Sequence, residues 1–177
     1  SGDDQIVYCA GCGYAANQEI AEARLDKIRG DQGELRKIPT PGKRTIGEVS
    51  SYLDILPQKL IKSLVYRIED GFAFVLVRGD HQVEERKLAS ALGDARPAEP
   101  EEIRALTGAD AGFVSPVGIG GVVVIADPIL EGGKGLVAGA NENDHHYIGV
   151  DVGRDIHVNR FVSLREVLPG DACMSCG

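Results

Sequence analysis

The clearest hydrophobic pattern lies near the middle of the chain, where two apolar runs flank a short turn. The first run, residues 61–68, reads Ile-Lys-Ser-Leu-Val-Tyr-Arg-Ile, and the second, residues 72–77, reads Phe-Ala-Phe-Val-Leu-Val. The Asp70-Gly71 pair between them is typical of a hairpin turn. We therefore expect an antiparallel hairpin. Because the second run is apolar on both faces, we expect it to be a central strand.

Helices are predicted on both sides of this hairpin. Thr45-Ile46-Gly47-Glu48 has capping-box spacing and begins a helix that buries apolar side chains and ends before Pro57. Pro100 occupies a favoured first-turn position before another helical segment. The helix that begins at Thr45 buries Ile46, Val49 and Leu53. Three further helices are expected: a short polar helix over Gln18 to Leu25, a second over Glu84 to Leu92 and a third over Glu101 to Leu106.

Three short apolar segments, residues 122–126, 135–138 and 147–150, follow in the C-terminal half and are separated by Gly-rich turns. They predict three further strands. Strands and helices are mixed without a regular βαβ repeat. We therefore expect an α+β fold with a mixed, curled multi-stranded sheet and peripheral helices.

Composition places these elements in one domain. At 177 residues the chain can bury about 70% of its unfolded surface. The net charge of −8 argues against a broad surface that follows nucleic-acid phosphates, although a local basic patch could still hold such a partner. No apolar stretch approaches the roughly 20 residues that span a membrane. The acidic N-terminus lacks a signal sequence and a starting Met, so we expect a processed, cytoplasmic chain without a membrane partner.

The cysteines add a constraint on the chain ends. They form two Cys-x-x-Cys-Gly motifs, one near each terminus: Cys9 and Cys12, and Cys173 and Cys176. Two such motifs commonly supply the four thiolates of a structural zinc site, which would bring the termini together, as in an insertion into a host protein. We therefore divide the chain into residues 1–30 and 166–177, which carry the motifs and the connections to the host, and residues 31–165, the domain between them.

Other interpretations of the cysteines stay open. Disulfides would require an oxidising compartment, and a redox pair would start a helix in a βαβ unit, a context that the sequence does not offer. Reduced thiols without a metal are the next alternative. A catalytic zinc is disfavoured because four thiolates leave no open coordination position.

Candidate functional residues cluster at strand ends and glycine turns. Lys62 interrupts an apolar strand, so its ammonium either reaches solvent or faces a partly buried pocket where it can stabilise an anion. The loop from Gly112 to Pro116 can present backbone N–H groups, although such a loop is often only a turn. His145 and His146 are adjacent, so only one can face a given pocket. The Arg78-Gly79-Asp80-His81 segment more simply ends the strand than forms an adhesion motif.

Taken in order, these segments resemble a known family. The motifs are Tyr-Cys-x-x-Cys-Gly-Tyr-Ala-Ala-Asn, Thr-Pro-Gly before Thr45-Ile46, Lys62-Ser63-Leu64, Arg78-Gly79-Asp80-His81, Gly112-x-x-x-Pro116, Gly139-Ala140-Asn141, His146-Tyr147, Gly153-Arg154-Asp155 and Gly170-Asp171. This order resembles the insertion domain of bacterial prolyl-tRNA synthetase, which is related to the YbaK-type aminoacyl-tRNA deacylases. The resemblance runs from about residue 5 to the end.

The resemblance implies hydrolysis of alanine wrongly esterified to the proline tRNA. By position, Lys62 matches the family's essential lysine, and Gly112 to Pro116, with Ser115 inside it, matches the Gly-x-x-x-Pro loop. His146 and Asp127 match residues of the amino-acid pocket. The implied partners are the acceptor end of tRNA(Pro) and the remainder of the synthetase, which would use ATP and Mg. No catalytic metal is required.

One departure and two rival functions accompany the resemblance. Glu84 stands where the family tends to have asparagine, which adds negative charge near the expected tRNA side. The domain could instead act on cysteine or serine attached to a tRNA, because one or two atoms decide such specificity. It could also be a non-catalytic, zinc-tethered module that positions tRNA.

Overall fold

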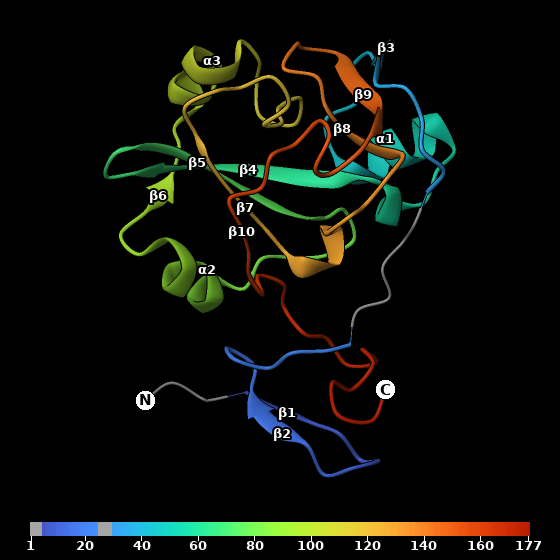
Figure 1. Ribbon diagram of the computed structural model, residues 1–177, viewed down its shortest axis with the longest axis vertical. Helices are drawn as coiled ribbons and strands as arrows, with labels where there is room; N and C mark the ends of the chain where they lie inside the picture. Colours follow the sequence, from blue (N-terminus) through green and yellow to red (C-terminus); the bar gives the residue numbers. More distant parts are fainter. Residues whose placement is uncertain (1–4, 25–29) are drawn as a thin grey trace.

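A computed structural model describes residues 5–24 and 30–177, and we describe it in two parts. We call residues 31–165 the main body, and residues 5–24 together with 166–177 the terminal module. Figure 1 shows the terminal module at one end of the molecule, built from the two ends of the chain lying side by side. The close approach of the two cysteine motifs that we expected from the sequence is confirmed.

A five-stranded sheet forms the centre of the main body, in the order β10-β7-β5-β4-β6. The predicted hairpin is confirmed, with β4 and β5 antiparallel in one register from Ile61↔Arg78 to Ile68↔Gly71. β5 pairs on its other side with the parallel strand β7, so it is central, and apolar clusters cover both of its faces. The strands are β4 (Ile61–Ile68), β5 (Gly71–Arg78), β6 (Arg96–Pro97), β7 (Val123–Ala126) and β10 (Arg160–Phe161).

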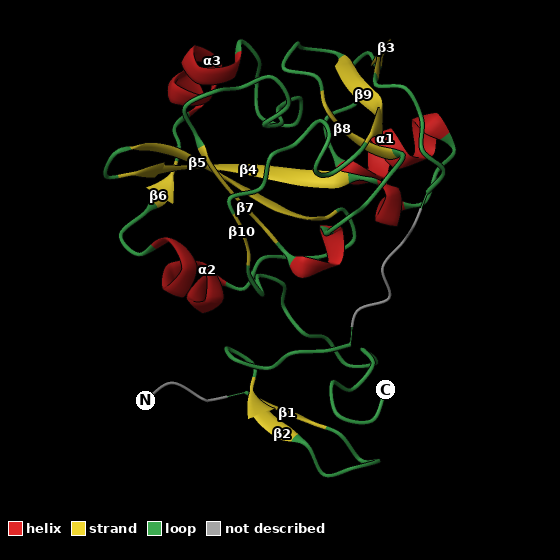
Figure 2. Ribbon diagram, viewed as in Figure 1, coloured by secondary structure: helices red, strands yellow, loops and turns green. Residues whose placement is uncertain are grey.

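A second, three-stranded antiparallel sheet packs beside the first (Figure 2). It consists of β3 (Arg36–Pro39), β9 (His145–Val150) and β8 (Leu136–Gly139). A bridge between Leu60 and Val137 joins it to the beginning of β4, and these two side chains form a small core with Val49. This contact holds β8 and β9 next to the first half of β4.

Helices cover the outside of these sheets. The capping box at Thr45 and Glu48 begins α1 (Ile46–Leu53) as predicted, and Asp54 ends it in the left-handed conformation. The other two predicted helices of the main body are also confirmed, as α2 (Glu85–Leu92) and α3 (Pro100–Thr107). Short 3-10 turns, η1 (Pro57–Lys59) and η2 (Pro128–Leu130), complete the helical elements of the described chain.

The terminal module contains a short ribbon, β1 (Ile6–Tyr8) paired with β2 (Ala15–Asn17). The helix predicted over Gln18 to Leu25 is wrong where the structure describes it, because residues 18–24 form turns and an extended segment; Leu25 lies outside the described residues. Contacts with the main body explain the difference. Lys87 Nζ donates to Ala21 O at 2.5 Å and Arg165 Nη2 to Ala23 O at 3.2 Å, so these carbonyls face cationic side chains rather than helical amides.

The α+β fold class is confirmed, with mixed parallel and antiparallel strands, outer helices and converging ends. The strands are distributed over three separate sheets. Within residues 5–24 and 30–177, no helix has the length and apolar character needed to traverse a bilayer.

Candidate functional site

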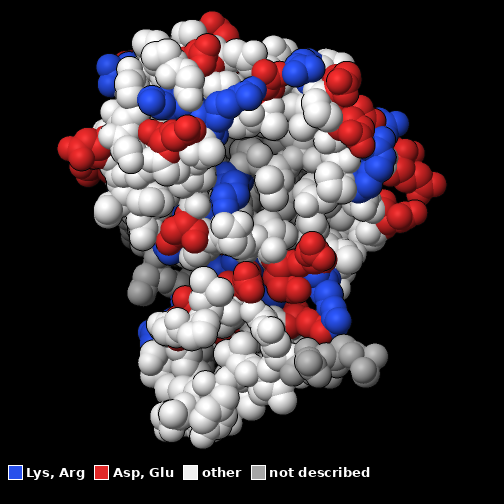
Figure 3. Space-filling view, turned by 180° about the vertical axis from the view of Figure 1, so that it is seen from behind, with Lys and Arg blue, Asp and Glu red and all other residues white. Residues whose placement is uncertain are grey.

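A cavity of about 470 Å³ opens along the first half of β4. It exists because β6 pairs with β4 only at Tyr66 and Arg67, which leaves the edge of β4 before these residues open. The beginning of α1, the loop around residues 111–114 and the strands β8 and β9 surround this edge. Figure 3 shows a hollow with basic side chains at its margin on the face turned away from the viewer of Figure 1. The volume is within the range of small-molecule sites, about 300–1,000 Å³.

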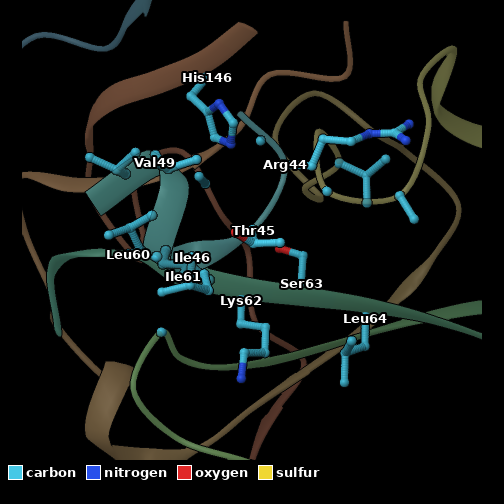
Figure 4. Close-up of a pocket in the computed structure, with 18 of the residues that line it drawn as sticks. Arg44, Thr45, Ile46, Val49, Leu60, Ile61, Lys62, Ser63, Leu64 and His146 are labelled. Atoms are coloured by element: carbon cyan, nitrogen blue, oxygen red, sulfur yellow. The ribbon is translucent and has the colours of Figure 1, made fainter. Parts of the chain in front are cut away.

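Lys62 lies on β4 and lines this cavity. Figure 4 shows Lys62 and Ser63 pointing to opposite sides of the strand, as strand alternation requires. The Lys62 ammonium donates to His81 O at 2.6 Å and to Gln82 Oε1 at 3.3 Å. Burial lowers the pKa of Lys62, and the charge of Asp80 acts in the opposite direction. Lys62 is therefore a partly desolvated cation held by the turn that follows β5.

The loop that begins at Gly112 forms another wall of the cavity. Gly112 has φ of +98°, and a Cβ there would lie 2.8 Å from Arg44 O, so both conformation and space require glycine. Gly139 on β8 packs directly against the backbone of Phe113 and Val114, where a Cβ has no room. Glycine at these two positions lets three backbone segments meet at the wall of the cavity.

The rest of the Gly112–Pro116 segment lies behind the wall. Ser115 is fully buried, and its hydroxyl donates to Gly139 O at 2.7 Å. Asn141 accepts from Ser115 N and donates to Val117 O, both at 2.9 Å, so it fastens the loop to the β8–β9 turn. Of the segment, Gly112 and Val114 line the cavity, whereas Ser115 and Pro116 do not. The latter two residues thus fix the shape of the loop from behind.

His146 is the inward-facing member of the histidine pair. His146 is 4% exposed and lines the cavity, and its Nδ1 lies 2.6 Å from Thr40 Oγ1. Burial lowers the pKa of His146, while a hydrogen bond with the Gly112 backbone acts against that shift, so the ring is neutral at pH 7. His145 faces the other side of β9 and lies 3.4 Å from Glu142.

Asp127 is not brought to this cavity. Its carboxylate accepts from Ile129 N at 3.1 Å and from Leu164 N at 2.9 Å, and it is 1% exposed. It lines a different cavity, next to Lys87 and Arg165. In the described structure Asp127 therefore fixes the chain around η2, apart from Lys62 and His146. The resemblance placed it in the amino-acid pocket, and its backbone contacts account for its different position.

Sequence reasoning did not assign a role to Gln82 and Arg44, which line the cavity, or to Thr40, which contacts a lining residue. Gln82 contacts Lys62, Thr40 contacts His146, and Arg44 lies over the Phe113 ring at 5.4 Å. Thr40 belongs to the marked Thr-Pro-Gly motif, Arg44 directly precedes Thr45, and Gln82 directly follows His81, so their place in or beside a motif is the signal that could have found them. Glu84, the departure from the family pattern, caps α2 by accepting from Lys87 N at 2.8 Å.

The four cysteines form a separate cluster in the terminal module. The four Sγ atoms all lie within 4.8 Å of one another. The Sγ–Sγ distance is 3.6 Å in each of the pairs Cys9–Cys176 and Cys12–Cys173. A disulfide would require about 2.05 Å. Four sulfurs at about 2.3 Å from one zinc ion lie about 3.8 Å from one another, so the spacing is compatible with a closed tetrahedral site. Backbone amides of Ser175 and Cys176 lower the pKa of Cys173 to about 6, which favours the thiolate.

Comparison with known proteins agrees with this geometry. Residues 40–155 match the model of a family described as the aminoacyl-tRNA editing domain. The chain is 40% identical over 180 residues to a proline–tRNA ligase of Thermotoga maritima, covering 99% of this chain and 31% of that protein. It is 44% identical over 182 residues to the proline–tRNA ligase of Pelobacter propionicus, covering 99% of this chain and 32% of that protein. The chain thus spans about a third of the length of these relatives.

The fold also has solved neighbours. One is a protein provisionally described as a trans-editing enzyme for prolyl tRNA synthetase, with TM-score 0.63, 26% identity, and coverage of 75% of this chain and 87% of that one. A hypothetical protein, APE2540, shares the fold at TM-score 0.62 and 20% identity, covering 75% of this chain and 92% of its own. The family match covers the elements that form the cavity, and the neighbours share their arrangement. The chain therefore belongs to the aminoacyl-tRNA editing domain family.

Proposed function

We propose that the chain is the editing domain of a proline–tRNA ligase and that it hydrolyses alanine wrongly attached to tRNA(Pro). The observation that carries this proposal is the convergence of Lys62, the Gly112 loop and His146 on one cavity. The similarity to proline–tRNA ligases supports the choice of tRNA. In this proposal the partners are the acceptor end of the tRNA and the remainder of the synthetase.

The need for such a site follows from size. Alanine is smaller than proline, so a site that accepts proline cannot exclude alanine by sterics. A second site too small for proline can remove the error after transfer. Apolar side chains line the cavity and give it the character required to hold a methyl group: Ile46 and Val49 of α1, Leu60 just before β4, and Ile61 at the beginning of β4.

In the mechanism we infer, water attacks the ester carbonyl and the bond to the ribose oxygen breaks. The proton of the water ends on the released ribose hydroxyl, with the neighbouring ribose hydroxyl of the tRNA as relay, and free alanine leaves. The Lys62 ammonium and the backbone N–H groups of the Gly112 loop stabilise the oxyanion, a contribution of about 10²–10³ in rate for one donor. Neutral His146, fixed by Thr40, shapes the pocket.

Zinc has a structural role in this proposal. Cys9, Cys12, Cys173 and Cys176 would hold it with no open position, so it stabilises the terminal module and takes no part in hydrolysis. The terminal segments, residues 1–30 and 166–177, then join the domain to the host synthetase, whose own reaction would use ATP and Mg.

The test compares hydrolysis of alanyl-, cysteinyl-, seryl- and prolyl-tRNA(Pro) by the purified chain, beside Lys62→Ala. The proposal predicts release of alanine, no release of proline, and loss of activity in the variant. Release of cysteine or serine instead would preserve the chemistry and change the substrate. Binding of tRNA with no hydrolysis of any ester, by this chain and by the full-length ligase, would identify a positioning module and overturn the proposal.

A further inference from the structure

The turn after β5 holds the Lys62 ammonium through two different acceptors. His81 O lies 2.6 Å from Lys62 Nζ, and Gln82 Oε1 lies 3.3 Å from it. A lysine ammonium has three donors and no acceptor. Two of the three N–H donors of Lys62 thus point to acceptors on consecutive residues of one turn. The third N–H remains for a substrate in the cavity that Lys62 and Gln82 both line.

This turn is itself fixed by several contacts. Arg78 donates from Nε to Asp80 Oδ1 at 2.6 Å and from Nη2 to Asp80 Oδ2 at 2.8 Å, and Nη2 lies 3.0 Å from His81 Nε2. Gly79 N donates to Leu60 O at 2.8 Å, and a Cβ at Gly79 would lie 3.1 Å from Leu60 Cβ, so the turn lies directly against the chain before β4. The His81 carbonyl and the Gln82 backbone therefore have a defined position relative to Lys62.

Asp80 already supplies a negative charge near Lys62. Burial lowers the pKa of Lys62, and Asp80 is the charged group that raises it. Although burial pushes the pKa of Asp80 upward, hydrogen bonds from Arg78 keep it below its usual value, so Asp80 is ionised. Arg44 and His146 line the cavity from other elements but do not shift the pKa of Lys62. Gln82 thus adds an acceptor to Lys62 without adding a second carboxylate.

We propose that Gln82 is a positioning residue: with the His81 carbonyl it orients the Lys62 ammonium so that its remaining N–H points to the ester in the cavity. This inference rests on the proposed deacylation. It adds a residue of the turn after β5 to the machinery, although Gln82 itself does not touch the reacting atoms.

The test uses Gln82→Ala and Gln82→Glu, with Gln32→Ala as control because Gln32 is exposed and outside the cavity. In Gln82→Ala we expect kcat for alanyl-tRNA(Pro) to fall about tenfold with KM unchanged, the low end for losing one hydrogen bond to a charged group. Gln82→Glu keeps an acceptor oxygen, so kcat recovers to within about twofold of wild type. Its carboxylate favours the charged ammonium, so any basic limb of the pH profile moves to higher pH.

Three outcomes separate this inference from the proposed function. If Lys62→Ala is inactive while Gln82→Ala retains full kcat, the inference is overturned and the function stands. If Gln82→Ala and Gln82→Glu lose activity equally, Gln82 does not act through its acceptor, and the inference fails. If neither the wild-type chain nor the full-length ligase hydrolyses any ester, the function fails. In that case NMR titration of the Lys62 side chain still decides whether Gln82 contacts it: Gln82→Glu raises the Lys62 pKa if the contact exists, and an unchanged pKa refutes it.

Discussion

The main body and the terminal module are stabilised in different ways. The main body buries large apolar side chains on both faces of β5, including Phe74, Leu76 and Ile125. Among the described residues, the buried cluster of the terminal module consists of Ala21, Ala23 and Val167. Much of its apolar surface is exposed instead, on Ile6, Tyr8, Ile20, Leu168 and Met174. Few charged side chains appear at its tip in Figure 3.

This difference suggests that the two parts have different functions. A core this small gives little stability by itself, and the spacing of the four cysteines is compatible with a metal ion that would stabilise the module. The main body needs neither, and the candidate site lies wholly within it. We therefore expect the chemistry to depend on the main body and attachment to depend on the terminal module.

Removing the Lys62 ammonium should strongly reduce activity without reducing stability. Lys62→Ala loses a donor in a desolvated site, so deacylation of alanyl-tRNA(Pro) falls by at least about 10²-fold. The free energy of unfolding stays the same or rises, because burial of this cation opposes folding. Single-turnover rates and urea unfolding measure the two effects. Lys134→Ala, an exposed lysine outside the cavity, is the control. A near-normal rate in Lys62→Ala would contradict the assignment.

Displacing the Gly112 loop from behind should impair both activity and stability. In Gly139→Ala the new methyl group meets the backbone of Phe113 and Val114, so the loop must move. We expect a loss of about 1–3 kcal/mol in the free energy of unfolding and a rate decrease of about 10²-fold. Gly120→Ala is the matched control, because a Cβ there meets open space. Equal rates in both variants would show that the loop position is not important for the reaction.

Metal removal should disorder one part and spare the other. With chelator, or with both Cys12→Ser and Cys176→Ser, we expect residues 5–24 and 166–177 to lose amide protection in hydrogen exchange. β4 and β5 should keep theirs, because their core does not include the cysteine cluster. The double variant Cys12→Ser, Cys176→Ser, measured in zinc-containing buffer without chelator, controls for effects of the chelator other than metal removal. Loss of protection throughout β4 and β5 would show that the two parts form one cooperative unit.

The smallest effect concerns the pH dependence of stability. Burial lowers the pKa of His146 below 6.5, so the unfolded chain binds a proton at pH values where the folded protein does not. The contribution of His146 to the free energy of unfolding is then fully present above about pH 6.5 and is lost as the pH falls through the folded-state pKa of His146. Burial lowers the pKa of His81 in the same direction.

To isolate His146, metal-free protein is unfolded with urea at a series of pH values, because acid also protonates zinc ligands. His146→Asn should show a shallower decline in stability below pH 6.5 than wild type. His157→Asn, which changes an exposed histidine, should decline like wild type. Identical slopes in all three proteins would mean that His146 does not titrate differently in the folded state.

Local patterns predicted most of the fold of the main body. Two apolar runs around an Asp-Gly turn predicted the β4–β5 hairpin, and capping residues predicted the beginning of α1. The same reasoning failed for residues 18–24, because Lys87 and Arg165, distant in sequence, bind the carbonyls of Ala21 and Ala23. A tertiary contact of this kind leaves no periodic signal.

The candidate site was predictable only in part for a similar reason. The motifs marked Lys62, Gly112 and His146, which the structure brings to one cavity. The resemblance also assigned Asp127 to the pocket, whereas its carboxylate is bound by backbone amides elsewhere. Gln82 carried no signal except its place after His81, since its contact with Lys62 depends on the register of β4 and β5 and on the turn between β5 and α2.

The most direct test of the account is single-turnover hydrolysis of alanyl-tRNA(Pro) by wild type, Lys62→Ala and the Cys12→Ser, Cys176→Ser double variant, measured side by side with saturating protein. The account predicts that Lys62→Ala is inactive and that the double variant retains a rate within about threefold of wild type, because the cavity lies in the main body. A double variant that is inactive while Lys62→Ala hydrolyses the ester normally would place the chemistry in the cysteine cluster and contradict the account.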